Sequence, residues 1–392
     1  MFRQLVFRIV FFSFMFIMSF YLTYHQVFGP EVDYETFKFF ASDTLQHIEY
    51  IKQYFNGTKY IPHPLWHILV KITSVFLNVS IEHAAILTSS LILLFWFILV
   101  YYVVKVLLVN ELLNKTYLYK ETIVILIAFS ICVIGPLVIP FYNGIIYKGV
   151  GSPNIWHNVT LWTVKPLALI SIVFSIWGLQ TQKKRFFVYA MVATISSILA
   201  KPSFVIIFLP SIFLLMINKR YISKINVYFL MSLIIFSLLV LSYQYMHTYN
   251  NGRGGIIIDI LGVWSIGSNN VPLSIFLAIA FPSLFYILYP RASRNDFLFL
   301  AWLQVLFGII LYAIFAEKGS NYAHGNFGWS YQISLSMLYL FSIIEFYKNY
   351  FILNIIKRRF LLTVLLIQVL IGIYYLVRIL QGQNPIYIGV FL

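Results

Sequence analysis

The feature that most constrains this chain is a series of long apolar segments, separated by short polar stretches, that runs through almost its whole length. Hydrophobic residues occupy 61% of the 392 positions and charged residues only 10%, against about 25% charged residues in a typical soluble domain. A helix needs about 20 consecutive apolar residues to cross a bilayer. The sequence therefore predicts an all-α polytopic membrane protein and excludes a soluble globular domain.

About eleven segments are candidate spans, and they form a single transmembrane domain over 1–392 with no separate soluble domain. The residues Lys201-Pro202 divide two short segments, which are either two helices or one broken helix, because proline interrupts the helical hydrogen-bond ladder. The first segment is not followed by a small-residue cleavage site and is interpreted as a retained anchor. The eleven segments are 9–28, 83–108, 122–141, 159–180, 186–200, 203–218, 225–246, 272–290, 297–316, 329–347 and 360–380.

The charge pattern predicts how the chain is oriented in the membrane. If the N-terminus is inside, 17 of the 27 Lys and Arg residues fall on the inner side and eight of the twelve acids on the outer side. Cytoplasmic loops carry an excess of Lys and Arg, so this arrangement is favoured. The sequence therefore predicts an integral protein of the plasma or inner membrane, with its N-terminus in the cytoplasm.

Histidine shows a second asymmetry, which places the active face on the extracytoplasmic side. All eight His residues fall at or near the outer side, in loops that are longer and more polar than the inner ones. The net charge of +15 does not predict a nucleic-acid partner, because the basic residues are scattered between apolar segments rather than gathered on one solvated face.

The first outer loop, 29–82, is the most informative polar stretch. Its segment 43–55 has apolar residues near helical spacing, with Ser42 or Asp43 as the N-cap and Asn56-Gly57 at its end. A second segment, 65–77, is only 13 residues long and is too short to span a bilayer. We therefore expect two amphipathic helices that lie at the membrane interface.

Asp43 and His47 form an i, i+4 pair and lie on one face of the first of these helices. A carboxylate beside an imidazole suits general-base catalysis. Glu49, the third candidate catalytic residue, points to roughly the opposite face. The alternative interpretation is structural: Asp43 only caps the helix, and His47 only sits among the lipid head groups.

The stretch 42–107 resembles the first outer loop and second span of the GT-C glycosyltransferases, in the protein O-mannosyltransferase and lipid A aminoarabinose transferase branches. It has an acid-bearing helix at Asp43, then His63-Pro64-Leu65 at the start of a second helix, then a long span. The resemblance implies a GT-C-like fold, a polyprenyl-phosphate sugar donor, a glycan or glycolipid acceptor, and Asp43 as general base. The family often has two acids close together, so Asp33-Tyr34-Glu35 is an alternative site for the base.

Four residues are candidates for binding the donor phosphate, and six for binding the sugar or the acceptor. A lysine at a membrane interface can also simply extend its amine to water, and a tryptophan there can simply belong to the aromatic belt. Both interpretations are left open. The phosphate-binding candidates are Lys165, Lys201, Arg253 and His324, and the sugar-binding candidates are His63, Asn154, Trp156, His157, Asn158 and Asn326.

The sequence predicts no cofactor with certainty. His63 and His67 have an i, i+4 spacing that can hold zinc, but no third ligand is evident. A divalent ion held by outer-loop acids with a pyrophosphate is an alternative that stays open, although the sequence does not indicate it. Nucleotide-binding and HExxH motifs are absent. Two alternatives to a monosaccharide transferase remain: a polymerase of polyprenyl-pyrophosphate oligosaccharides, as in O-antigen or capsule assembly, and a lipid-linked sugar transporter or flippase.

Overall fold

The computed structural model describes residues 2–29, 42–113, 115–139, 146–249 and 255–382, and most of these residues are helical. Seven of the described helices are long and apolar enough to cross a membrane. The prediction of a helical, multi-pass membrane protein is therefore confirmed. The seven helices are α1 (Phe2–Phe28), α4 (Ile81–Leu107), α7 (Val159–Thr181), α10 (Lys224–Tyr249), α14 (Asp296–Ile314), α15 (Gly328–Lys348) and α16 (Ile355–Leu380).

Shorter helices occupy the other four predicted segments. α12 (Val271–Ala278) and α13 (Ala280–Leu288) are bent by 72° at their junction and together count as an eighth candidate span. The remaining three segments hold α6 (Tyr117–Val133), α8 (Lys184–Ala200) and α9 (Ser203–Asn218). The helical structure is interrupted at Lys201-Pro202, as predicted, between α8 and α9.

α6 ends well before the predicted end of its segment at residue 141. Gly135-Pro136 follows the helix, and a residue before proline is disfavoured in the α conformation. Gly135 also packs against Gly372 of α16, so closely that a Cβ on Gly135 would lie 3.0 Å from the Gly372 Cα atom. The helix therefore stops where another backbone crosses it, although the sequence remains apolar.

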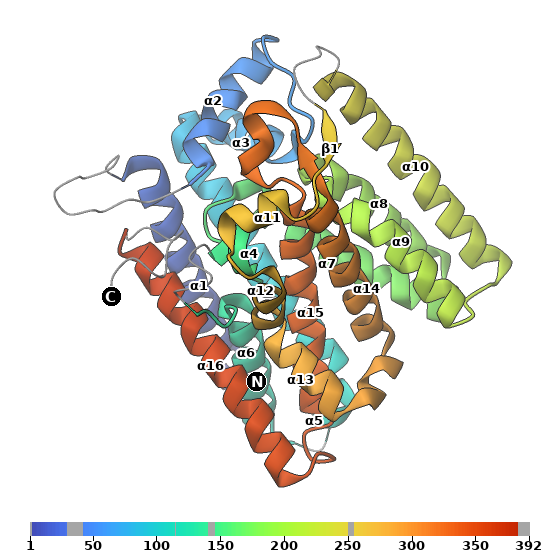
Figure 1. The fold of residues 1–392 in the computed structure, drawn as a ribbon. Helices are drawn as coiled ribbons and strands as arrows, with labels where there is room; N and C mark the ends of the chain where they lie inside the picture. Colours follow the sequence, from blue (N-terminus) through green and yellow to red (C-terminus); the bar gives the residue numbers. More distant parts are fainter. Residues whose placement is uncertain (1, 30–41, 114, 140–145, 250–254, 383–392) are drawn as a thin grey trace.

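The bundle has two central helices and several peripheral ones. α15 and α7 are almost wholly buried, whereas most of α10 and α1 faces outward. Figure 1 shows α10 at one edge of the bundle and α1 with α16 at the other. The closest helix pairs are α7 with α8, α14 with α15, and α1 with α4. Asn158, which precedes α7, and Trp329 of α15 are therefore attached to the buried centre of the bundle.

Two ends of the bundle differ in structure. One end carries α2 (Thr44–Phe55), α3 (Leu65–Leu77), α11 (Gly262–Gly267) and the antiparallel strands β1 (Ile256–Ile258) and β2 (Phe315–Glu317), and it occupies the upper half of Figure 1. We call it the cavity end. The opposite end carries α5 (Val109–Leu112) and the short helix η2 (Pro290–Arg294). The helices predicted at 43–55 and 65–77 are confirmed as α2 and α3.

Candidate functional site

A cavity of about 740 Å³ lies at the cavity end. This volume falls within the range of about 300–1,000 Å³ that is usual for ligand sites. Its wall combines residues from every long loop that the charge pattern assigned to the outer side, although these loops are far apart in the sequence. The lining residues lie within 42–50, 62–63, 147–148, 157–160, 201–206, 241–248, Ile256, Glu317 and 324–330.

Asp43 lines this cavity and its carboxylate does not cap α2. No hydrogen bond joins its side chain to the start of that helix, and Ser42 Oγ accepts from the Thr44 N–H at 3.0 Å instead. The Asp43 N–H donates to the His157 carbonyl at 2.9 Å, which ties the start of α2 to the loop before α7. Asn158 Nδ2 donates to Asp43 Oδ2 at 2.6 Å. Asp43 therefore occupies the N-cap position of α2, as one of the two residues predicted there, but its side chain does not cap the helix.

Asn158 is held in one orientation because it also caps α7. Its Oδ1 accepts from the Leu161 N–H at 2.8 Å and from the Thr160 hydroxyl at 2.9 Å. The amide oxygen is thus committed to the helix, and the amide NH2 group is directed to Asp43. Sequence reasoning placed Asn158 in a sugar-binding role, whereas the geometry makes it a support for the carboxylate.

Lys201 brings a positive charge to the same wall. Its Nζ lies 3.0 Å from Thr160 Oγ1, 3.5 Å from Asn158 Oδ1 and 4.7 Å from the centre of the Trp329 ring. Burial lowers the pKa of Lys201 to about 8, and the nearby Asp43 carboxylate opposes that shift. The amine is therefore mostly charged at neutral pH and lies near the carboxylate.

A second lysine, Lys148, lines the cavity from the short helix η1 (Ile146–Val150). Its Nζ donates to the Ala323 carbonyl at 2.7 Å. Burial lowers the pKa of Lys148, and Asp43 again opposes the shift, so this lysine also lies near the carboxylate. Two cations thus share the cavity with Asp43, which makes it suited to an anionic ligand.

The aromatic part of the wall consists of Tyr147, His157 and Trp329. Tyr147 and Trp329 stack with their ring centres 5.9 Å apart and their planes 9° apart, and the His157 ring lies 4.7 Å from Tyr147. Burial lowers the pKa of His157, while Asp43 opposes the shift. Flat aromatic faces beside a few polar groups are typical of small-molecule sites.

Three histidines form the α2–α3 side of the site. His47 and His63 line the cavity, and the buried His67 lies behind them with its Nε2 2.9 Å from His47 Nδ1. Burial lowers the pKa of His63 to about 3 and that of His67 to about 4, and it lowers the pKa of His47 well below its usual value. All three rings are therefore neutral at pH 7.

No metal site accompanies these histidines within the part of the chain that the structure describes. There, no group of three or more His, Cys, Asp or Glu side chains is arranged to hold an ion. A zinc site at His63 and His67 would need a third ligand, which the described residues do not supply.

The structure brings together most of the residues that the sequence singled out, although they come from five separate segments. Eight of the thirteen candidates line the cavity: Asp43, His47, His63, His157, Asn158, Lys201, His324 and Asn326. Glu49 is exposed on the other side of α2, where its carboxylate accepts from Gln53 Nε2 at 3.3 Å. Arg253, like the alternative acids Asp33 and Glu35, lies outside the described residues.

Asn154, Trp156 and Lys165 lie behind the wall rather than on it. Lys165 Nζ donates to the Pro153 carbonyl at 2.6 Å and to Asn154 Oδ1 at 3.3 Å. The three residues surround a separate void of about 10 Å³, which is water-sized and too small for a sugar or a phosphate. Their geometry is that of a buried structural support, not of the ligand contacts that the sequence suggested.

Sequence reasoning missed Lys148, Glu317 and Trp329, which all line the cavity. Each stands in one of the long polar loops that were assigned to the outer side. The charges of Lys148 and Glu317 were the signal by which the sequence could have marked these two residues as site candidates. Nothing in the sequence shows that their two loops face each other in the folded chain.

Comparison of the chain with protein-family models, curated proteins and solved structures finds no match. The fold and the site together define a helical, multi-pass membrane protein with a polar cavity at one end of its bundle.

Proposed function

We propose that this protein is a membrane glycosyltransferase of the GT-C type, which moves a sugar from a polyprenyl-phosphate donor to a hydroxyl of a lipid-linked glycan or another cell-envelope acceptor. One observation carries the proposal: the Asp43 carboxylate, which does not cap its helix, faces a ligand-sized cavity that it shares with Lys148 and Lys201. A carboxylate available as a base beside cations available for a phosphate is the minimum that such a reaction needs.

The proposed reaction is a single displacement. The acceptor hydroxyl gives its proton to the Asp43 carboxylate while its oxygen bonds to the anomeric carbon of the sugar. The bond from that carbon to the phosphate oxygen breaks, and its electrons leave with polyprenyl phosphate, so the anomeric configuration inverts. Lys201 lies near the carboxylate and would stabilise the charge that develops on the leaving phosphate. Much of the rate enhancement would come from holding the two substrates together.

The wall of the cavity supports a lipid-linked donor. Part of the lining comes from the apolar helices α9 and α10, and two of these residues also lie on the outer surface of the bundle. Ile206 is 37% exposed and Tyr245 is 53% exposed, so the cavity opens sideways between α9 and α10. We call this opening the apolar mouth. An anionic head group with an apolar chain fits a cavity that has lysines inside and a mouth of this kind.

The finer features of the topology belong to the same proposal. They are eleven spans, including α6, α8 and α9, a GT-C arrangement of the helices, a cytoplasmic N-terminus, and a cavity that faces the extracytoplasmic side. The support is that each loop lining the cavity is one that the Lys and Arg pattern assigns to the outside.

The test is a transfer assay with the full chain in lipid nanodiscs. A panel of radiolabelled polyprenyl-phosphate hexoses is incubated with the protein and with cell-envelope glycan as acceptor. We expect transfer from at least one donor, its loss in Asp43→Asn, and its retention in the matched control Glu49→Gln, which changes an exposed acid on the same helix. Transfer by Asp43→Asn at the wild-type rate would refute the assignment of the base.

The second lysine favours one alternative, a polymerase that uses polyprenyl-pyrophosphate oligosaccharides. Lys148 and Lys201 both line the cavity, and a pyrophosphate carries more charge than a phosphodiester. A polymerase would leave the monosaccharide donors of the panel untouched and would elongate a pyrophosphate-linked oligosaccharide, again with dependence on Asp43. Movement of intact lipid-linked sugar across sealed vesicles, without a covalent product, would instead identify a transporter or flippase.

A further inference from the structure

A second part of the cavity wall is exposed, and it is polar. Gln46 of α2 and His324 and Asn326 of the segment after β2 line the cavity, and all three side chains are exposed. The apolar mouth, by contrast, is bordered by Ile206 and Tyr245. Residues that belong both to a cavity wall and to the outer surface mark an opening. We infer that these three exposed residues mark a second opening, the polar mouth, whose chemistry is opposite to that of the apolar mouth.

The polar mouth has groups that can bind hydroxyls. Asn326 Nδ2 donates to Glu317 Oε2 at 2.6 Å, so an amide and a carboxylate are held side by side at its edge. Carboxylates and amides offer several acceptor sites and donors that a neighbouring pair of sugar hydroxyls can share. Phe327 and Trp329 follow Asn326 along the wall and lead from this edge toward the interior.

Both openings lead to the Asp43 carboxylate. Trp329 at the inner end of this aromatic wall contacts Lys201, whose Nζ lies 4.7 Å from its ring centre, and Lys201 in turn lies near Asp43. Lys148 joins the two regions from another side, because its amine bonds to the carbonyl of Ala323, next to His324. A ligand that enters at Asn326 can thus reach the base without passing the apolar mouth.

We propose that the polar mouth, framed by Gln46, His324, Asn326 and Glu317, is a separate acceptor site, which admits a hydrophilic glycan from water while the lipid-linked donor occupies the apolar mouth. This inference rests on the proposed function for the roles of the two substrates. It adds that the part of the acceptor that enters this site is a glycan in the aqueous phase, and not a lipid head group within the bilayer.

The first experiment measures access and does not require transfer. Cys132 is the only cysteine and is buried, so single cysteines introduced elsewhere can be labelled selectively. A charged maleimide is applied to Asn326→Cys, Ile206→Cys and the control Asn321→Cys in lipid nanodiscs, with and without polyprenyl phosphate. Asn321 is exposed near the polar mouth but does not line the cavity.

We expect rapid labelling of Asn326→Cys and Asn321→Cys, little labelling of Ile206→Cys, and no protection of Asn326→Cys by polyprenyl phosphate. An unlabelled Asn326→Cys beside a labelled Asn321→Cys would overturn the proposal, because the mouth would then be closed to water. Protection of Asn326→Cys by polyprenyl phosphate would also overturn it, because the lipid would then occupy this mouth.

The second experiment separates the two substrates in the transfer assay. Asn326→Ala should raise the acceptor KM about threefold to tenfold, as expected for a lost hydrogen bond, with the donor KM unchanged. Asn321→Ala should change neither constant. Absence of transfer by the wild type would count against the proposed function, whereas normal transfer with an unchanged acceptor KM in Asn326→Ala would count against the acceptor site alone.

Discussion

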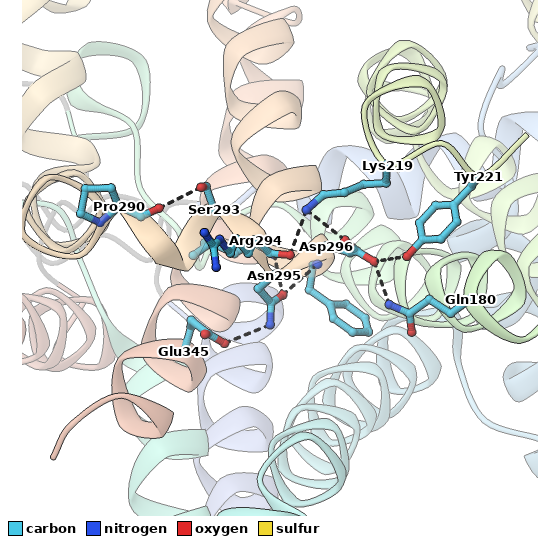
Figure 2. Close-up of polar contacts among 11 residues, drawn as sticks. Gln180, Lys219, Tyr221, Pro290, Ser293, Arg294, Asn295, Asp296 and Glu345 are labelled. Atoms are coloured by element: carbon cyan, nitrogen blue, oxygen red, sulfur yellow. Dashed lines mark hydrogen bonds and ion pairs between the residues drawn. The ribbon is translucent and has the colours of Figure 1, made fainter. Parts of the chain in front are cut away.

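Two aspartates at opposite ends of the bundle have very different surroundings. Asp296, at the start of α14, accepts hydrogen bonds from Gln180 Nε2 at 2.8 Å and from the Tyr221 hydroxyl at 2.6 Å, and it pairs with Lys219 Nζ at 3.3 Å. Figure 2 shows these three side chains converging on it. At the cavity end, among the described residues, the Asp43 carboxylate accepts a single side-chain hydrogen bond, which comes from Asn158 Nδ2.

The difference shows how to separate a structural acid from a functional one. An ionised carboxylate has about four acceptor sites, and the neighbours of Asp296 occupy most of them. Its partners come from α7 and from the segment after α9, so the carboxylate ties these elements to the start of α14. Glu121 is similar, because it accepts from Arg8, Tyr101 and Lys105. Asp43 instead presents its acceptor capacity to a cavity.

Replacement of the Asp43 carboxylate by an amide is the strongest test of this comparison. Asp43→Asn should lower the transfer rate by about 10²–10⁴-fold, because an amide cannot take a proton from the acceptor. The folded state should persist, because the new amide oxygen can still accept from Asn158. Turnover and thermal unfolding are measured on the same preparation. A loss of activity accompanied by an equal loss of folded protein would make Asp43 structural, like Asp296.

The converse variant is Asp296→Ala. It leaves Lys219 without its ion-pair partner and Gln180 and Tyr221 without an acceptor, which we expect to cost about 2–4 kcal/mol of stability. The melting temperature should fall by several degrees, while the rate per folded molecule stays the same. Arg294→Ala, a neighbouring change outside the carboxylate's contacts, is the control for stability. An unchanged melting temperature in Asp296→Ala would remove the contrast between the two ends.

Lys201 tests whether the cavity end is built for an anion. Lys201→Ala should raise the donor KM about 10- to 100-fold, as expected when one charge-assisted contact to phosphate is lost, and Lys201→Arg should retain much of the affinity. Because the pKa of Lys201 is about 8, the affinity of the wild type for the donor should also decline as pH rises through 8. The alanine variant should lack this decline. Equal donor KM values in all three proteins would exclude a role for Lys201 in donor binding.

The sequence predicted the local structure of the site well but not its tertiary assembly. α2 and α3 follow from helical periodicity and from the breaks at Asn56-Gly57 and Asn78, and all of these signals are local. Lys165 and Lys201, each of which is followed by a proline, show the limit of sequence reasoning. Lys201 reaches the cavity, whereas Lys165 is buried against Pro153, and the sequence around the two lysines is too similar to tell them apart.

Long-range backbone contacts account for the differences in the fold. Hydropathy predicted a span to residue 141, but α6 ends at Val133, next to the crossing of Gly135 and Gly372. These glycines are 237 positions apart, and only the folded chain brings them together. The bend between α12 and α13 has a local cause as well, because Pro282 lacks the N–H that would bond to the Ala278 carbonyl, which accepts instead from the Tyr339 hydroxyl at 2.8 Å.

A dependence of stability on pH should also distinguish the two ends. His63 and His67 of the cavity end have pKa values of about 3 and 4, below the value of about 6.5 in an unfolded chain. Between these values the unfolded chain binds more protons than the folded chain, so stability should fall as pH falls from 6.5 toward 4.

Thermal unfolding across this pH range checks the effect, with His63→Gln as the variant and the exposed His324→Gln as the matched control. His63→Gln should make the melting temperature less sensitive to pH, because one group that must stay neutral in the folded chain is gone, whereas His324→Gln should leave the slope as in the wild type.

Hydrogen exchange should locate the acid-induced opening in α2 and α3, because that end holds the buried imidazoles. Opening that begins instead around Asp296 would reverse the comparison, since the end with the saturated carboxylate would then be the weaker one.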